Sequence, residues 1–499
     1  MPTPPVNTAP RRAAHRTGLT NPKRIGLIAG PSLAALALAL APLWEGLSPA
    51  GVGVLALTTL IAVWWVTEAI PIPATSLLPA IFVPFTGALG LREALAGYAN
   101  PIIFLFLGGF VIATSLERWN LHTRIALNVV ARSGASPAAL IAGFMLAAAG
   151  LSMWISNTAT ALMMTPIALS VAAAVLGKDY VGRPFALALL LGIAFSCSIG
   201  GRGTLVGTPT NAIVKGYIEA EFGREIGFAE WMALGLPVVA VLLPIAWLCL
   251  TRLVFRLEAK DVAGAPAIIR ERLAGLGPIT TPETRVAIVF ALVAAAWMFR
   301  RLIVRVPGLE TLSDTAIALI GAVALFVVPA GAGEKGEALL DWETAAKLPW
   351  GILLIFGGGL SLAAAISASG LAAWLGGRLE GLTSFHPIML IFAVTVLVVL
   401  LTELTSNVAT ATALMPVLGA IATAGRLDPM LLAAPAAMAA SCAFMLPVAT
   451  PPNAIVFASG AVRIVDMARA GVALNVFSAL VLTVMCYVLV PIVFGRTAT

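Results

Sequence analysis

The chain has 499 residues, of which 60% are apolar and 11% are charged, and its formal net charge is +7. A water-soluble protein has about 25% charged residues, so this chain cannot cover itself with a water-facing surface, and its surplus apolar surface must face lipid. The composition therefore excludes a soluble enzyme, a secreted disulfide scaffold and a disordered chain. It predicts a multi-pass membrane protein whose basic residues mark loops rather than a nucleic-acid surface.

Residues 1–25 contain several basic residues and no acid, which predicts a disordered, basic cytoplasmic tail. The segment 26–49 holds the first apolar run and predicts an uncleaved first span. Further spans are expected near 50–67, 76–93, 101–117, 186–206, 231–251, 286–299, 314–330, 349–370, 428–447 and 472–494, with a cytoplasmic connector over 252–285. Two other apolar pairs, over 137–176 and 386–423, are interrupted by polar residues and are therefore predicted to be re-entrant hairpins.

The basic residues indicate how these spans are threaded. With a cytoplasmic N-terminus, most basic loops fall on the cytoplasmic side, as the positive-inside rule requires. A cluster of Arg300, Arg301 and Arg305 falls on the opposite side and conflicts with this threading. We keep the threading because more basic residues lie in the cytoplasmic loops than in this cluster. The sequence therefore predicts a multi-pass protein of the cell inner (plasma) membrane.

The chain also contains an internal repeat. The run Ser156–Ala161 recurs as Ser406–Ala411 with one difference, and Phe106, Gly108 and Gly109 recur at the same spacing of 250 residues. Downstream, Thr208–Val214 recurs as Thr450–Val456 at a spacing of 242 residues, with six identities in seven. Three matches in the same order indicate a duplicated unit.

Each unit holds an odd number of membrane crossings, so the second unit must enter the membrane in the opposite orientation. The first unit, 50–251, contains the hairpin 137–176 and an unwound helix over 186–222. The second, 286–494, contains the hairpin 386–423, an unwound helix over 428–460 and the last span 472–494. The expected fold is an all-α polytopic membrane protein with about eleven transmembrane helices plus two re-entrant hairpins in two inverted repeats, an architecture typical of secondary transporters.

The polar breaks predict a binding site. Each hairpin tip presents the N-terminus of its second arm, whose free N–H groups suit a carboxylate. The carbonyls, Ser hydroxyls and Asn oxygens at the same tips suit a small cation. Pro209 and Pro451 remove amide donors in the neighbouring helices and free carbonyl groups there. A single Thr-Pro break is commonly an ordinary kink, but four breaks paired by a repeat favour a ligand site.

At these residues the sequence resembles the divalent anion:sodium symporter family, which carries dicarboxylates, citrate or sulfate, and in particular its bacterial di- and tricarboxylate carriers. The similar stretches are Trp64–Pro71, Met153–Thr158, Gly207–Asn211, Thr405–Asn407 and Phe444–Ala454, and the likeness runs from about residue 26 to the end. The resemblance implies a homodimer. Each protomer would have a scaffold domain and a mobile transport domain that carries the site across the bilayer as an elevator.

The resemblance also implies which residues bind. The first sodium site would consist of Ser152, Ser156, Asn157 and Gly207, and the second of Thr402, Thr405, Asn407 and Ala449. The substrate carboxylates would meet Ser156, Asn157, Thr158, Thr208 and Pro209 on one side, and Ser406, Asn407, Val408, Thr450 and Pro451 on the other.

A few residues call for a separate interpretation. Val408 stands where the first repeat has Thr158, and the lost hydroxyl is predicted to shift selectivity rather than abolish binding. Arg202, beside the first sodium site, is predicted to snorkel or to pair with an acid; alternatively it is a fixed cation that weakens sodium dependence. Glu68 and Glu403 are functional candidates, but a salt bridge or a hydrogen bond that stabilises the tip is favoured over a proton relay.

These features predict a secondary active transporter, not an enzyme, that couples the import of a C4-dicarboxylate such as succinate to sodium. The alternatives are a sodium-independent dicarboxylate exchanger of the same fold and an anion channel. A membrane enzyme would need a nucleophile–base pair or a metal cluster, and the sequence suggests neither. The cysteines, Cys197, Cys249, Cys442 and Cys486, are expected to be buried, apolar-like side chains.

Overall fold

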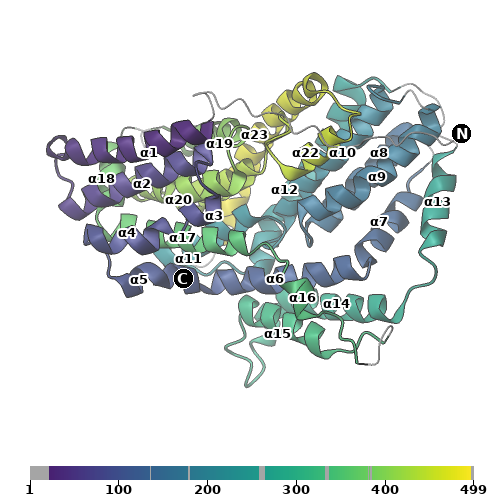
Figure 1. Cartoon of the computed structure of the whole chain (residues 1–499), viewed down its shortest axis with the longest axis horizontal. Coiled ribbons are helices and arrows are strands. Elements are labelled where there is room, and N and C mark those ends of the chain that lie inside the picture. The colour runs from purple at the N-terminus through teal and green to yellow at the C-terminus, as the bar shows by residue number, and fades with distance from the viewer. Residues whose placement is uncertain are drawn as a thin grey trace, which may run out of the picture.

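The structure, a computed structural model, describes residues 22–134, 136–177, 180–257, 264–331, 336–379, 381 and 385–495. Within these ranges the chain runs through helices from α1 (Pro22–Ala39) to α23 (Ile464–Phe494) and forms no β-strand (Figure 1). The prediction of an all-α chain is confirmed. Most of the predicted basic tail, residues 1–21, and the middle of the predicted connector, residues 258–263, lie outside the described residues.

Nine helical segments in the described ranges are long and apolar enough to cross a membrane, which confirms a multi-pass membrane protein. They are Pro49–Thr67 (α2), Leu91–Arg118 (α5 and α6), Asn157–Leu176 (α9), Pro184–Gly203, Phe228–Val254, Thr281–Ile303 (α14), Trp350–Ala368 (α17), Asn407–Ala424 (α20) and Ile464–Phe494. Five shorter apolar segments accompany them: Ile72–Thr86, Pro137–Ser152 (α8), Asp314–Val327 (α15), Pro387–Thr402 (α19) and Met430–Ala440 (α21). The expected spans 314–330 and 428–447 are among these shorter helices.

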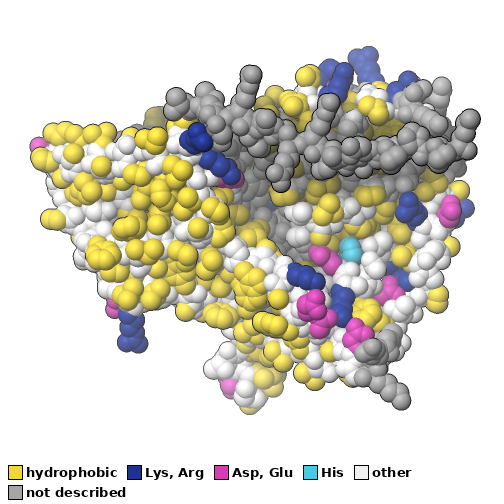
Figure 2. Space-filling view, viewed as in Figure 1, with side chains coloured by type: hydrophobic (Ala, Val, Ile, Leu, Met, Phe, Trp, Pro, Cys, Tyr) yellow, Lys and Arg dark blue, Asp and Glu magenta, His cyan; other side chains and the backbone are white. Residues whose placement is uncertain are grey.

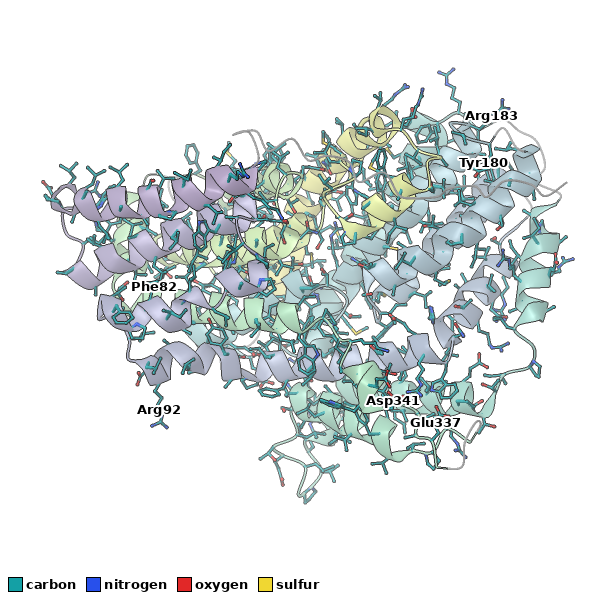
Figure 3. The ribbon with its side chains drawn as sticks, in the orientation of Figure 1. Phe82, Arg92, Tyr180, Arg183, Glu337 and Asp341 are labelled. Atoms are coloured by element: carbon teal, nitrogen blue, oxygen red, sulfur yellow. The ribbon has the colours of Figure 1, made fainter. Side chains whose placement is uncertain are left out.

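One group of helices lies at the left of Figure 1. In it α1 packs along α2, and α2 contacts α4 (Leu78–Thr86) and α17. The short helix α3 (Ile72–Thr75), α5 (Leu91–Ala96) and α18 (Leu371–Arg378) complete the group. Hydrophobic side chains cover the face of this group in Figure 2, and Arg92 at the start of α5 projects away from the protein (Figure 3). This apolar face is the surface expected where helices meet lipid.

A second group holds the two helical hairpins. The buried helix α10 (Pro184–Gly200) packs against α8, α9 and α12 (Phe228–Leu248), while α23 packs against α12, α19 and α21. Around them lie α7 (Leu121–Ala131), α11 (Pro209–Phe222), α13 (Ala265–Gly275) and α22 (Pro451–Ala458). Five short elements remain in the described ranges: α16 (Trp342–Ala345), three 3₁₀ turns, Ala41–Leu43, Gly97–Ala99 and Gly201–Gly203, and the π-helical end of α12, Cys249–Val254.

Equivalent residues of the two repeats touch each other. The rings of Phe106 on α6 (Pro101–Arg118) and Phe356 on α17 meet edge to face with centroids 5.1 Å apart. A residue that contacts its own counterpart must lie close to the axis that relates the two repeats. The contact between α6 and α17 is the kind expected near the axis of an inverted duplication.

Ion pairs tie the helices together at several places, among them the end of α6. Arg118 at the end of α6 pairs with Glu337 at 2.7 Å and with Asp341, two acids that lie side by side near α16 (Figure 3). The N–H of Thr344 and, with it, the Arg118 guanidinium hold the pKa of Asp341 below its usual value. This pairing fixes the end of α6 to the segment that precedes α17.

Another of these places involves the arginines that conflict with the predicted threading. Arg300 pairs with Glu225 at 2.6 Å and with Asp314 at 3.2 Å, and Arg301 pairs with Glu230. Two of the three arginines in that cluster are thus paired with nearby acids, and they join α14 to α15, to the start of α12 and to the connection before it.

Candidate functional site

The two hairpin tips have the same local structure. In the first, α8 ends at Ser152 and α9 begins at Asn157; in the second, α19 ends at Thr402 and α20 begins at Asn407. The hydroxyls of Ser156 and Ser406 accept hydrogen bonds from the N–H groups of Ala159 and Ala409, at 3.1 and 3.5 Å, as helix caps. Each tip therefore presents the N-terminus of a long helix, which carries a partial positive charge.

The neighbouring helices are broken at the matching positions. Helix α10 ends at Gly200, continues as a 3₁₀ turn to Gly203, and is followed by α11 only from Pro209. Helix α21 ends at Ala440, and α22 begins at Pro451. Because proline has no N–H, it can begin a helix without leaving a donor unsatisfied.

Two asparagines hold these unwound segments in the same way. Asn211 donates from Nδ2 to the carbonyls of Gly201 and Thr204, at 3.1 and 2.7 Å. Asn453 donates to the carbonyls of Ala443 and Leu446, at 2.9 and 3.1 Å. In both repeats the partners lie ten and seven residues before the asparagine, so each unwound segment is braced identically.

Oxygen atoms without hydrogen bonds gather at the first tip. Asn157 Oδ1 and Ser152 Oγ are buried and have no hydrogen-bond partner among the described residues. A Cβ built on Gly201 would lie 2.9 Å from the carbonyl oxygen of Gly207 and 3.1 Å from Asn157 Oδ1, so both oxygens face the same small space. Unpaired buried oxygens are costly, and a cation would satisfy them. We refer to Ser152, Asn157, Gly201 and Gly207 as the first cradle.

The second tip places its oxygens closer together. Thr402 Oγ1 lies 2.7 Å from Asn407 Oδ1 and 2.6 Å from the carbonyl of Ala440. One hydroxyl has a single proton to donate, so it cannot satisfy both acceptors, and one oxygen is left for another partner. Thr405 Oγ1 lies 2.5 Å from Thr410 Oγ1 nearby. We refer to Thr402, Thr405, Asn407 and Ala440 as the second cradle.

A cavity of about 920 Å³ connects the two tips, at the upper end of the size usual for ligand pockets. The predicted substrate residues line it with one exception: Ser156, Asn157, Thr158, Thr208, Pro209, Ser406, Asn407, Val408 and Pro451. Gly207, Thr405 and Ala449 line it as well. Thr450, Ser152 and Thr402 are buried and lie outside its lining.

The opposite wall comes from α1, α2, α6 and the start of α17. Among the described residues, it carries all the charged side chains of the cavity lining, which are Lys23, Glu68, Glu117 and Lys347. The tips and the unwound segments contribute no arginine or lysine to the lining. An anion bound between the tips would therefore meet helix N-termini and hydroxyls first.

Arg202 departs from the expectations. It is fully buried, donates from Nε to the carbonyl of Met438 at 2.9 Å, and lies 2.9 Å from Cys442 Sγ through Nη2. Its guanidinium carbon lies 5.8 Å from the centre of the Phe444 ring. The predictions of snorkelling and of an acid partner are both wrong, because the side chain is directed at α21 and the described residues offer it no carboxylate within ion-pair distance. The guanidinium also does not line the cavity.

The family can be established by comparison with known proteins. Residues 27–494 match the family described as the sodium:sulfate symporter transmembrane region. The chain belongs to this family. Two relatives, both named sodium-dependent dicarboxylate transporter SdcS, come from Staphylococcus saprophyticus and Staphylococcus aureus. The first is 45% identical over 482 residues, covering 95% of this chain and 93% of the relative. The second is 45% identical over 483 residues, covering 94% and 92%. The resemblance stated from the motifs is confirmed.

A solved structure supports the fold. The Alcanivorax borkumensis YdaH transporter, described as having an unusual topology, matches with a TM-score of 0.55 and 17% identity, over 88% of this chain and 99% of that one. At this identity the match shows the fold alone. As a member of the sodium:sulfate symporter family, the chain is a transporter and not an enzyme.

Sequence reasoning missed two site features in this member of the family. Asn211 and Asn453 were seen only as part of a repeated Thr-Pro-X-Asn motif, although their recurrence was a sufficient signal that they act alike. The carbonyl of Ala440 was not predicted at the second cradle, because no side chain marks where a helix stops. The four cysteines are buried and free, as expected.

Proposed function

We propose that the chain is a sodium-coupled symporter that imports small dicarboxylates, with a C4-dicarboxylate such as succinate as its substrate. The observation that carries this proposal is the pair of oxygen cradles, one in each repeat, that flank a single cavity between two helix N-termini. The names of the staphylococcal relatives, which are sodium-dependent dicarboxylate transporters, agree with it.

The cradles support sodium as the coupled ion. Sodium and other hard cations prefer oxygen ligands from carbonyls, hydroxyls and amides. Asn157 Oδ1 and the Gly207 carbonyl form such a set at the first cradle, and the buried Ser152 Oγ is the expected third ligand. Thr402, Asn407 and the Ala440 carbonyl form the set at the second. We assign one sodium ion to each, with Ser156, Thr405 and Ala449 as the remaining expected contributors.

The cavity supports a dianion. Its floor between the tips combines two capped helix N-termini with the Ser156, Thr158, Thr208 and Ser406 side chains and the apolar Val408. Helix N-termini and hydroxyls stabilise carboxylates, but burying two negative charges without opposite charge is costly. Bound sodium would supply that charge, which links substrate binding to sodium.

The cavity lining also suggests which side the site faces. In the predicted threading, the start of α1 and the end of α6 lie at the cytoplasmic side, and Pro22, Lys23 and Glu117 from these ends line the cavity. We therefore propose that the site faces inward, with the N-terminus at the cytoplasmic side. From the resemblance to the family we further propose elevator-type movement of the hairpin group against α1–α6, in a homodimer.

Uptake of labelled succinate into proteoliposomes tests the proposal. We expect saturable uptake that requires an inward sodium gradient and that falls at least about tenfold in Asn157→Ala and Asn407→Ala. Thr165→Ala, at a buried position on α9 outside the cavity lining, is the matched control and keeps uptake. Counterflow without sodium would instead establish the exchanger, and flux that does not saturate would establish a channel.

A further inference from the structure

The two unwound segments differ in length. We measure each segment from the asparagine that braces it. In the first repeat the helical structure of α10 and its 3₁₀ turn ends at Gly203, eight residues before Asn211. In the second repeat α21 already ends at Ala440, thirteen residues before Asn453. The second segment therefore leaves more backbone N–H and C=O groups outside any helix, and buried groups of this kind need partners.

A single carboxylate accepts the freed N–H groups. Glu403 Oε1 accepts hydrogen bonds from the N–H groups of Phe444 and Met445, at 2.8 and 3.0 Å. Its Oε2 accepts from Met445 and Leu446, at 3.1 and 3.2 Å. Asn475 on α23 donates to Oε1 at 2.6 Å. Both oxygens act only as acceptors in these contacts, which is the pattern of an ionised carboxylate in a nest of backbone N–H groups.

The described residues of the first repeat show no such group at the equivalent position. The residue at the position of Glu403 is Met153, whose side chain packs on Gly203, with a Cβ built on Gly203 lying 3.1–3.2 Å from three of its atoms. Arg202 in the first repeat corresponds to Phe444 in the second, counted from the bracing asparagines. Side chains of opposite charge therefore lie on either side of Phe444. Glu403 accepts a hydrogen bond from its backbone N–H, and the Arg202 guanidinium lies over its ring.

The contacts lead from Glu403 to the second cradle. Glu403 follows Thr402 directly, and its partner Leu446 accepts hydrogen bonds through its carbonyl from Asn453 Nδ2 at 3.1 Å and from the N–H of Ala449 at 3.2 Å. The early end of α21 is also what leaves the Ala440 carbonyl free to meet Thr402 Oγ1 at 2.6 Å. Removing the carboxylate would release the segment that supplies this carbonyl.

We propose that Glu403 is a positioning residue for the second cation site, one that holds the segment 441–446 unwound and adds a buried negative charge beside the second cradle. This proposal rests on the proposed sodium coupling. It implies that the two cation sites are unequal, because only the second is supported by a carboxylate, and a nearby negative charge raises the affinity for a cation.

The test compares Glu403→Gln with Met153→Gln, the matched change at the first tip. Sodium dependence of succinate uptake is measured at saturating succinate, and the succinate KM is measured at saturating sodium. In Glu403→Gln we expect the half-saturating sodium concentration to rise at least about tenfold, because four N–H donors lose a charged acceptor. The succinate KM at saturating sodium should stay within about twofold. Glu403→Asp should restore part of the sodium affinity, and Met153→Gln should leave it near that of the wild type.

The outcomes separate this proposal from the proposed function. Wild-type uptake without sodium dependence overturns both. Sodium-dependent wild-type uptake with unchanged half-saturation in a folded Glu403→Gln protein overturns only the role of Glu403, as does an equal change in sodium and succinate affinities. Where Glu403→Gln does not fold, Asn475→Ala keeps the charge but removes one donor at 2.6 Å, and a sodium half-saturation unchanged in that variant also overturns the role.

Discussion

Replacement of Gly201 by alanine tests the first cradle through its shape alone. The new Cβ would lie 2.9 Å from the Gly207 carbonyl oxygen and 3.1 Å from Asn157 Oδ1. Both contacts are shorter than side-chain carbons normally make. The two oxygens must therefore move apart, or the new methyl group occupies the space between them that a cation would fill. Backbone strain plays no part, because Gly201 has φ −54° and ψ −21°, a helical conformation that alanine adopts readily.

The magnitude follows from the overlap. Forcing one methyl group into a packed site costs about 1–3 kcal/mol. If that cost falls mainly on the cation-bound state, it weakens binding by a factor of about 5–150. Substitution of neighbouring glycines would be harsher: a Cβ on Gly200 would lie 2.1 Å from the Ala149 carbonyl oxygen, so that variant would disturb folding rather than the cradle alone.

Sodium-dependent thermal unfolding of the detergent-solubilised protein provides the assay, because an ion that binds only the folded state raises the melting temperature with its concentration. In Gly201→Ala we expect the rise to need about 5–150 times more sodium. The control is Ala443→Gly, at the equivalent position ten residues before Asn453, where the native chain already carries a methyl group. It should respond to sodium as the wild type does. An unchanged sodium response in Gly201→Ala would refute the placement of a cation at the first cradle.

Other expectations concern the substrate, the brace and the direction of opening. Val408→Thr restores the hydroxyl found at Thr158 and should change the ratio of succinate to citrate KM values by about 3–10-fold, with Thr158→Val shifting it too. Asn453→Ala leaves the buried carbonyl of Ala443 without a donor and that of Leu446 with only the N–H of Ala449, and should lower the free energy of unfolding by about 1–3 kcal/mol, measured by denaturation. Thr114→Cys, in the cavity lining, should react with a membrane-impermeant maleimide from the cytoplasmic side only, and more slowly with sodium and succinate present; the native cysteines are buried and give little background.

Much of the fold could be predicted because its signals are local. Long apolar runs predict spanning helices, and the polar tips stand out against them. The tips at Ser156–Asn157 and Ser406–Asn407 coincide with helix N-termini because serine is a favoured N-cap and no apolar residue replaces it there. The recurrence of these residues in both repeats also predicts that the two tips contribute to one site.

The contacts of the charged core residues could not be predicted in the same way. Arg202 lies in an apolar segment, where pairing with a carboxylate is the usual outcome, yet its partners are the Met438 carbonyl on α21 and the Cys442 thiol just after that helix. These partners lie 236 and 240 residues away in the chain, and no local pattern signals them. For Glu403 the sequence predicts a salt bridge or a hydrogen bond that stabilises the tip, and it does not distinguish between them. The donors that Glu403 meets depend on where α21 stops, which is set by tertiary packing rather than by propensity.

The distribution of charge suits the elevator-type movement that we propose, in which the binding site crosses the bilayer in both directions. A carrier of this kind returns without its ligands, and a fixed cation at the binding site would have to cross the low-dielectric bilayer on every return, which is costly. Here the tips line the cavity with uncharged groups, while the charges Arg202 and Glu403 are of opposite sign and lie behind them. If each cradle holds one sodium ion, the loaded site carries two positive charges against the two of a dicarboxylate, so loaded and empty sites are both close to neutral. A positive side chain at the tips would improve binding but impede the return, and this conflict explains why backbone groups and sodium supply the positive charge.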